Sequence, residues 1–216
     1  MKVALIGATG FVGSSILKEL VSRGTEVIAI ARKTDDIDTS SALVTALAVD
    51  IMNQEALSKA IKGTDVVVSA FNPGWSNPNI YDDSLAGLQA IQQTVKEAGI
   101  PRYLVIGGAG SLEINGQQLV DGPEFPAEIK AGATAMRDYL NILKEEKDLQ
   151  WTFFSPAIEM HQGTKTGRTG KYRLGKDSPV FNEEQRSILS VEDLSVVIAD
   201  ELENNAFPNQ RFTAAY

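Results

Sequence analysis

The stretch KVALIGATGFVG, residues 2–13, decides the fold of this chain. It opens with a short apolar run, typical of a buried parallel strand, and passes directly into a turn with glycines at positions 7, 10 and 13. From residue 11 to residue 23 apolar side chains recur at helical spacing, and Gly24 is placed to end the helix. The stretch therefore predicts a strand, a glycine-rich turn and a helix in immediate succession.

The three glycines of this turn have separate physical roles. Gly7 permits the tight turn, Gly10 lets a phosphate approach the backbone, and Gly13 lets the helix pack on the strand. A glycine triplet also occurs as a purely structural turn, but this one joins an N-terminal strand to a helix. We therefore expect it to bind a dinucleotide through seven residues: Gly7, Ala8, Thr9, Gly10, Phe11, Val12 and Gly13.

The rest of the chain repeats the alternation of strand and helix. Short apolar runs predict strands, and longer stretches with helical spacing and terminal capping signals predict helices. The expected strands cover residues 26–31, 44–49, 65–70, 103–106 and 151–155, and the expected helices cover 53–63, 80–98 and 127–146. This order predicts an α/β fold of the Rossmann type, with a doubly wound, mostly parallel sheet flanked by helices in a single domain over residues 1–216.

The C-terminal part is less regular. Residues 163–178 are rich in glycine and basic residues, which predicts a loop or hairpin over the edge of the sheet. Ser190, with Asp193 three positions later, predicts the start of a helix, and residues 211–216 predict a last short strand. We expect the region around residues 156–190 to lie on the substrate side of the domain.

A pair of cations follows the second expected strand. Arg32 and Lys33 stand where NAD-preferring proteins usually have a carboxylate for the ribose hydroxyl, whereas Asp35 and Asp36 come too late in the chain. Two cations suit the 2′-phosphate of NADP through charge-assisted hydrogen bonds. We therefore expect NADP(H) to be preferred and NAD(H) to be a weaker ligand of the same site. The alternative is that the pair lies in a solvated loop.

The remaining cofactor contacts follow from the rule that ligands bind at the carboxyl ends of the strands. Residues after the third strand should flank the adenine, and residues after the fourth should line the ribose and nicotinamide. Residues after the fifth and sixth strands should complete the site. The candidates are Asp50, Ile51, Ala70, Phe71, Asn72, Pro73, Gly108, Ser155 and Pro156.

The composition excludes several classes of function. The chain has no cysteine and one histidine, so we expect no metal site. A formal charge of -8 repels polyanions, so nucleic acid is not an expected partner. No apolar run is long enough for a membrane span and no export signal is evident, so we expect a cytoplasmic protein, monomeric or homodimeric, that acts on a small molecule.

Four motifs carry a resemblance to a known family. They are GATG at 7–10, VIGGAGSL at 105–112, WTFFSP at 151–156, and TG at 166–167 continuing to GKD at 175–177. With them the chain resembles the atypical short-chain dehydrogenases, in the group of NmrA-like proteins, NADH-flavin reductases and biliverdin-IXβ reductases. The resemblance covers nearly the whole chain and implies a Rossmann fold with a nicotinamide cofactor.

The chain departs from this family at the catalytic pair, which is usually a tyrosine and a lysine four residues apart. Lys130 matches the lysine, but position 126 is Pro126 and its neighbour is Phe125. Reduction of an isolated carbonyl needs a nearby proton donor, whereas a conjugated ring spreads the charge of an accepted hydride and takes a proton from water. We therefore expect a reductase of a flat conjugated acceptor such as a flavin or quinone.

Two other functions remain open. A non-catalytic redox sensor that binds NADP, as the NmrA-like resemblance allows, also needs no tyrosine. A sugar epimerase or dehydratase fits less well, because the chain leaves little room for a substrate domain after the sixth strand.

The candidate catalytic residues are Ser111 and Lys130. Ser111 follows the fifth strand and is placed to orient the acceptor or the nicotinamide, although a serine in such a turn also serves as a simple cap. Lys130 and His161 are each more often solvated surface residues. The aromatic residues Phe71, Trp75 and Tyr81 are candidates for a wall against a flat acceptor, with core packing as the alternative.

Overall fold

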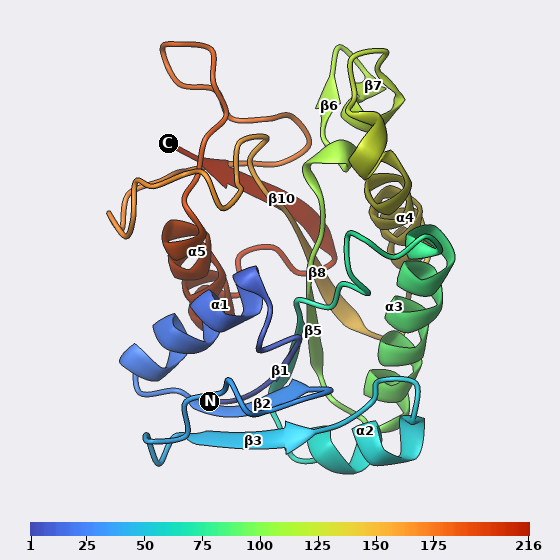
Figure 1. Cartoon of the computed structure of the whole chain (residues 1–216), viewed down its shortest axis with the longest axis vertical. Coiled ribbons are helices and arrows are strands. Elements are labelled where there is room, and N and C mark those ends of the chain that lie inside the picture. Colours follow the sequence, from blue (N-terminus) through green and yellow to red (C-terminus); the bar gives the residue numbers. More distant parts are fainter.

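The computed structural model describes all residues, 1–216, and is built on one eight-stranded sheet (Figure 1). The strand order is β3-β2-β1-β4-β5-β8-β10-β9, and every neighbouring pair is parallel except β10 and β9. The order reverses between β1 and β4, which is where doubly wound folds bind their ligands. The strands are β1 Lys2–Ile6, β2 Glu26–Ala31, β3 Val44–Ala48, β4 Val66–Ser69, β5 Arg102–Ile106, β8 Gln150–Ser155, β9 Arg173–Gly175 and β10 Gln210–Ala215.

Helices cover both faces of the sheet. One face is covered by α1 (Phe11–Ser22) and α5 (Val191–Asn204), which pack against each other. The other is covered by α2 (Gln54–Ile61), α3 (Ile80–Glu97) and α4 (Ala127–Lys144), with α3 between the other two. Burial on both faces explains why the central strands are continuous apolar runs and do not alternate with polar residues.

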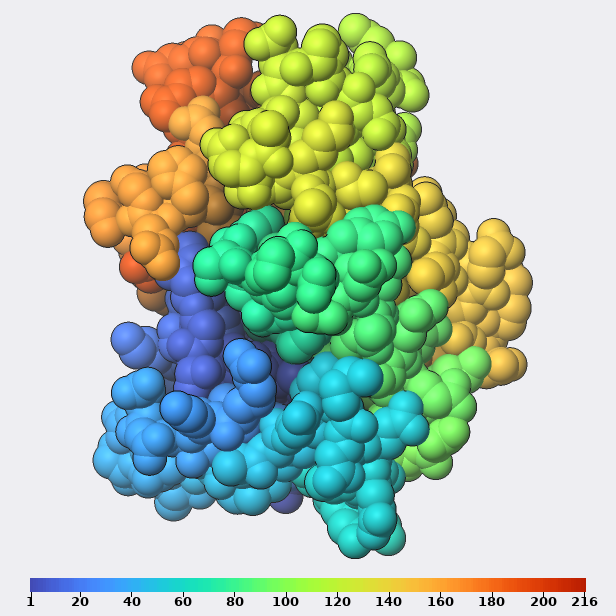
Figure 2. Space-filling view, turned by 45° about the vertical axis from the view of Figure 1, so that its right-hand side comes forward, coloured from blue at the N-terminus to red at the C-terminus, as the bar shows by residue number.

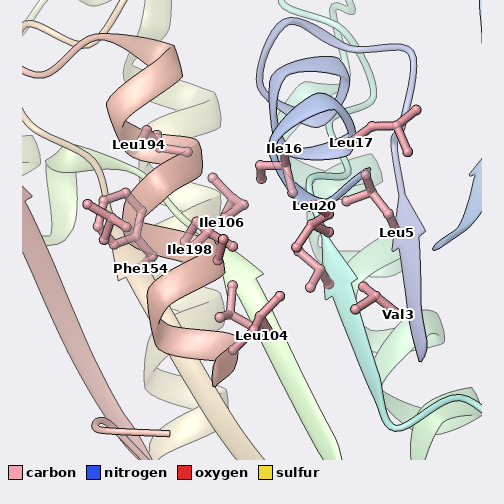
Figure 3. Packing of buried hydrophobic residues seen from close by; sticks show 14 of the residues in the cluster. Val3, Leu5, Ile16, Leu17, Leu20, Leu104, Ile106, Phe154, Leu194 and Ile198 are labelled. Carbon is pink, nitrogen blue, oxygen red and sulfur yellow. The ribbon is translucent and has the colours of Figure 1, made fainter. Parts of the chain in front are cut away.

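The alternation of side chains along each strand divides the core into two layers. Val3 and Leu5 of β1 point toward α1, while Ala4 and Ile6 point toward the layer under α2, α3 and α4. Figure 3 shows the first layer, in which side chains of α1 lie over β1 and side chains of α5 lie over β5 and β8. Because both faces of the sheet are packed in this way, the carboxyl ends of the parallel strands lie side by side along one rigid edge of the sheet.

The observed fold confirms the expected α/β class and the expected order of strands and helices. The last strand, β10, lies inside the sheet beside β8. Residues 163–178, expected as a loop or hairpin, form a loop that contains the edge strand β9, which pairs antiparallel with β10. The sequence pattern did not indicate the small hairpin of β6 (Glu113–Ile114) and β7 (Gln117–Gln118), which lies between β5 and α4. No helix has both the length and the apolar character needed to cross a membrane.

Candidate functional site

The glycine-rich turn lies at the carboxyl end of β1, between β2 and β4. Gly7 has a φ of +80°, which glycine adopts without strain. The N–H groups of Gly7 and Ala8 both donate to the carbonyl of Ile30, at 2.9 and 3.2 Å, and so tie the turn to β2. A Cβ at Gly7 would lie 2.5 Å from the carbonyl oxygen of Ala70. Only glycine fits between the two neighbouring strands at this point.

Gly13 and Gly10 serve the helix that follows. A Cβ at Gly13 would lie 2.0 Å from the carbonyl oxygen of Gly7, so α1 packs directly on the turn. Gly10 is the exposed N-cap of α1, and a Cβ there would meet only the Gly7 oxygen, at 3.3 Å. Of the other turn residues, Ala8 is buried, Val12 is half-buried, and Thr9 and Phe11 are exposed.

The N-terminus of α1 fits a phosphate group. It has no side-chain cap, a feature it shares with α3 and α4, and it alone among the five α-helices has no acidic residue in its first turn. The first N–H groups of a helix need an acceptor, and the helix dipole makes an anion the favoured one. Backbone accessible at Gly10, together with an uncapped helix end, is the arrangement that a dinucleotide pyrophosphate requires.

Arg32 and Lys33 follow the last residue of β2 directly. Ile30 of β2 pairs with Ile6 of β1, so the two cations leave the sheet next to the glycine-rich turn. Both side chains are exposed, and neither makes a hydrogen bond or an ion pair within the chain. They are therefore available to an anionic group of a bound cofactor.

The residues after β3 and β4 meet at one glycine of α3. A Cβ at Gly87 would lie 2.4 Å from the Phe71 ring and 3.0 Å from the Cδ1 atom of Ile51. Phe71 and Ile51 therefore pack toward α3. Asp50 is exposed and its carboxylate accepts from the N–H of Met52, at 3.0 Å.

The segment after β4 continues as an ordered loop. Ala70 N–H donates to the carbonyl of Ile6 at 2.9 Å, which keeps the segment beside the glycine-rich turn. Asn72 Oδ1 accepts from Gly74 N–H at 2.7 Å, and Pro73 between them is half-buried. The expected cofactor residues 70–73 thus lie at the edge where the strand order reverses.

The three candidate aromatic residues have different neighbours. Phe71 packs on Gly87, the Tyr81 hydroxyl donates to Asp138 at 2.8 Å, and the Trp75 ring lies against Gly132 of α4. Only Trp75 is exposed, with 59% of its surface accessible. Of these three candidates, Trp75 alone presents an aromatic surface to solvent.

Ser111 and Ser155 are brought together at the carboxyl ends of β5 and β8. Ser111 ends the short 3-10 helix η1 (Ala109–Ser111) and is fully buried. Its hydroxyl donates to the carbonyl of Gly108 at 3.0 Å and lies 3.0 Å from the Ser155 hydroxyl, which is also buried. In this geometry Ser111 holds the turn after β5, and Pro156 continues the buried end of β8.

Arg211 of β10, which the sequence reasoning did not single out, supports this turn. Its buried guanidinium donates to the carbonyl of Ser111 and forms ion pairs with Asp177 and Glu113, the former at 2.5 Å. The available signal was a single arginine within an apolar final strand. Arg211 therefore ties together the turn after β5, the β6–β7 hairpin and the loop after β9.

Lys130 lies in the first turn of α4, the helix that packs against η1. Its side chain is exposed and makes no ion pair within the chain. Four positions earlier Pro126 is the N-cap of α4, and Phe125 next to it lies 3.5 Å from where a Gly110 Cβ would be. The helix start therefore carries a lysine without the tyrosine that the resemblance implies.

None of the five tyrosines of the chain fills that place. Tyr103 and Tyr139 are buried beside each other in the core, and Tyr81, Tyr172 and Tyr216 donate to carboxylates. The pKa of every one is raised: burial is the largest cause for four of them, with the pKa of Tyr103 at about 12, and the hydrogen bond to Asp138 is the largest for Tyr81. A phenol with a raised pKa is a weak general acid.

His161 lies in the loop after β8. Its imidazole is exposed, and Nδ1 accepts from the N–H of Gly163 at 3.0 Å. That bond makes His161 part of the loop's own structure.

A hollow is visible on the surface of the molecule (Figure 2). In Figure 2 the hollow lies between the blue residues of α1 and the teal-green residues after β4, with dark-blue N-terminal residues deep within it. The glycine-rich turn, the cations after β2 and the loop after β4 all belong to this part of the molecule. The geometry is that of a dinucleotide site at the switch point of the sheet.

Comparison with known proteins agrees with this geometry. A family model described as NAD(P)H-binding matches residues 7–205. The chain belongs to this NAD(P)H-binding family. The match begins at the first glycine of the turn and extends through α5, so it includes every candidate site residue. The expected fold and the expected nicotinamide cofactor are both confirmed at this level.

Three similar proteins match along nearly their whole length. YwnB of Bacillus subtilis is 37% identical over an alignment of 216 positions that covers 99% of this chain and 97% of YwnB. A "putative epimerase" of Bacteroides thetaiotaomicron is 41% identical, with a TM-score of 0.92 over 100% of this chain and 96% of its own. A "putative NADH-flavin reductase" of Streptococcus pneumoniae is 33% identical, with a TM-score of 0.87 over 100% and 99%. This NAD(P)H-binding family is therefore oxidoreductase-like in character.

Proposed function

We propose that this protein is an NADPH-dependent reductase that delivers a hydride to a flat conjugated acceptor such as a flavin or a quinone. The observation that carries the proposal is the absence of a phenolic proton donor from a site otherwise built for a nicotinamide dinucleotide. Pro126 occupies the tyrosine position, and all five tyrosines are engaged elsewhere with raised pKa values. The similarity to the Streptococcus pneumoniae protein supports the same class of reaction.

The chain's own residues account for cofactor binding in two parts. The uncapped start of α1 at Gly10 is suited to the pyrophosphate. Arg32 and Lys33, exposed and unpaired, are suited to the 2′-phosphate that distinguishes NADPH from NADH. The absence of an acidic residue from the first turn of α1 removes a charge that would repel both phosphates.

When bound, NADPH supplies a hydride, two electrons with one proton, and leaves as NADP⁺. A flavin or quinone that accepts this hydride takes one further proton from water and becomes the two-electron-reduced form. The protein then has to align the nicotinamide ring with the acceptor ring and limit the access of water to them, without delivering a proton itself. Ser111, buried behind the turn after β5, fits a role in orientation, and exposed Lys130 fits a contact with a cofactor oxygen.

The second candidate is a non-catalytic sensor that binds NADP and signals redox state to a partner. The same absence of a proton donor favours it, because a sensor needs only the cofactor site. The two functions differ in one measurable property, which is turnover.

The experiment is anaerobic stopped-flow mixing of the NADPH-loaded protein with FMN or with menadione. A reductase oxidises NADPH in step with reduction of the acceptor, well above the rate without protein. The Gly10→Val variant is the matched control, since it blocks the phosphate site. Tight NADPH binding without oxidation by either acceptor would favour the sensor and contradict the reductase.

A further inference from the structure

Most of the exposed large apolar side chains of this chain lie beyond the carboxyl ends of the parallel strands. Single apolar residues are scattered over any protein surface, but clustering at one edge indicates a binding surface. Six of the eight exposed large hydrophobic residues lie in the segments that follow the carboxyl ends of parallel strands. They are Phe11, Met52, Trp75, Ile114, Ile129 and Ile158.

Trp75 is the most exposed of these residues, and its loop is held in place by hydrogen bonds. Gly74, with a φ of +112°, accepts at its carbonyl from Asn77 N–H, at 3.0 Å. Asn77 in turn accepts from Asn79 N–H at 2.9 Å and donates its amide to Asp83 of α3 at 2.7 Å. The indole is therefore presented to solvent by an ordered loop.

The inner side of the indole rests on a site in α4 that lacks a side chain. A Cβ at Gly132 would lie 2.9 Å from Cζ3 of Trp75 and 2.9 Å from Cδ1 of Ile80. A glycine in the middle of a helix lowers helix stability by about 1 kcal/mol relative to alanine, so its presence under the ring has a packing reason. Ile129, exposed one turn earlier on the same side of α4, extends the apolar surface.

We propose that the exposed face of Trp75 is the platform on which the conjugated ring of the acceptor stacks. This inference rests on the proposed reductase function and adds to it the residue that selects a flat aromatic substrate. An indole face offers a large, rigid surface to any conjugated ring, while its single N–H donor lies at the ring edge. Phe71 and Tyr81 do not compete for this role, because their rings are packed or bonded elsewhere.

The test compares Trp75→Ala, Trp75→Phe and Gly132→Ala with the native protein, using FMN and menadione. Loss of aromatic stacking should raise the KM for either acceptor about tenfold in Trp75→Ala. Trp75→Phe should stay within about threefold of the native KM. Gly132→Ala keeps the indole but displaces it, because the added Cβ would lie 2.9 Å from Cζ3 of Trp75, and it should raise the KM about threefold or more.

Binding is measured independently by calorimetric titration of FMN into the NADP⁺-saturated protein. The Kd for FMN should rise about tenfold in Trp75→Ala, while the Kd for NADP⁺ stays unchanged and circular dichroism shows a folded protein. Native turnover with an unchanged acceptor KM and FMN Kd in Trp75→Ala would overturn this inference alone. A native protein that neither binds FMN nor reduces either acceptor would overturn the proposed function and this inference with it.

Discussion

At the scale of single residues, Arg32 is the side chain that we expect to set cofactor preference. Its guanidinium is exposed and unpaired at the end of β2, and one or two charge-assisted hydrogen bonds to a 2′-phosphate would contribute about 1.5 to 3 kcal/mol each. Arg32→Ala should therefore weaken NADPH binding by about tenfold or more and leave NADH binding nearly unchanged. Calorimetric titration of both cofactors measures this, with the exposed Lys62→Ala as the control cation. Equal affinities for the two cofactors in the native protein would refute the assignment.

Substitutions at two glycines of the turn should have different effects, one on cofactor binding and the other on the stability of the fold. Gly10→Val places a side chain in the space that a pyrophosphate needs, and only the Gly7 oxygen lies nearby, so the variant should fold and lose both cofactors. Gly13→Ala places a Cβ 2.0 Å from a backbone oxygen and should lower the free energy of unfolding by about 3 kcal/mol or more. Circular dichroism shows whether each variant is folded and how stable it is, and calorimetric titration measures its cofactor binding. A folded Gly10→Val that still binds NADPH would place the cofactor elsewhere.

At the scale of elements, the end of α5 offers a test of local backbone geometry. Asn205 follows the helix with φ 49° and ψ 49°, and its side-chain oxygen is buried without a partner. Glycine adopts this left-handed conformation freely and removes the unpaired oxygen, so Asn205→Gly should stabilise the fold by about 0.5 to 1 kcal/mol. Asn205→Ala should destabilise it by about 1 kcal/mol. Urea unfolding distinguishes them, and an alanine variant as stable as the glycine variant would contradict the argument.

The contact between α3 and α4 should depend on pH through Glu146. The side chain is 6% exposed and accepts from Asp148 N–H, Lys96 and Gln92. Burial alone would raise the pKa of Glu146, but these hydrogen bonds together lower it from 4.5 to about 2. A carboxylate with a lowered folded pKa stabilises the fold above its unfolded value and loses that contribution as the pH falls through the folded pKa.

Glu146→Gln should therefore destabilise the protein by about 2 kcal/mol at pH 7, and the difference from the native protein should shrink between pH 4.5 and pH 2. Urea unfolding at several pH values measures this. Glu145→Gln, at an exposed neighbouring position without such bonds, is the control and should change the free energy of unfolding by less than about 0.5 kcal/mol. A difference for Glu146→Gln that does not vary with pH would rule out this account.

At the scale of the whole molecule, the sequence predicted the framework because its signals are local. The glycines at 7, 10 and 13 and the alternation of strand and helix can each be recognised within a short stretch of sequence. The structure confirms the turn, strands and helices that these stretches predict. The pairing of Ser111 with Ser155 and the contacts of Arg211 join residues far apart in the chain, so no periodicity indicates them. The different positions of Phe71 and Trp75 depend on Gly87 and Gly132 in other helices, which a local pattern does not reveal.

We propose that the site transfers a hydride to a conjugated ring without a protein proton donor. General acid catalysis contributes about 10² to 10⁴ in rate, so its absence should matter for an isolated carbonyl and much less for a conjugated acceptor. Ser111→Ala should lower turnover about tenfold or less, because a buried serine that holds the turn after β5 contributes less than an obligatory donor.

The most direct test is the ratio of kcat/KM for FMN or menadione to kcat/KM for a simple ketone, with NADPH, in the native protein and in Ser111→Ala. We expect ready oxidation of NADPH by the conjugated acceptors, little activity with the ketone, and a modest effect of the substitution. Robust ketone reduction that collapses in Ser111→Ala would contradict it.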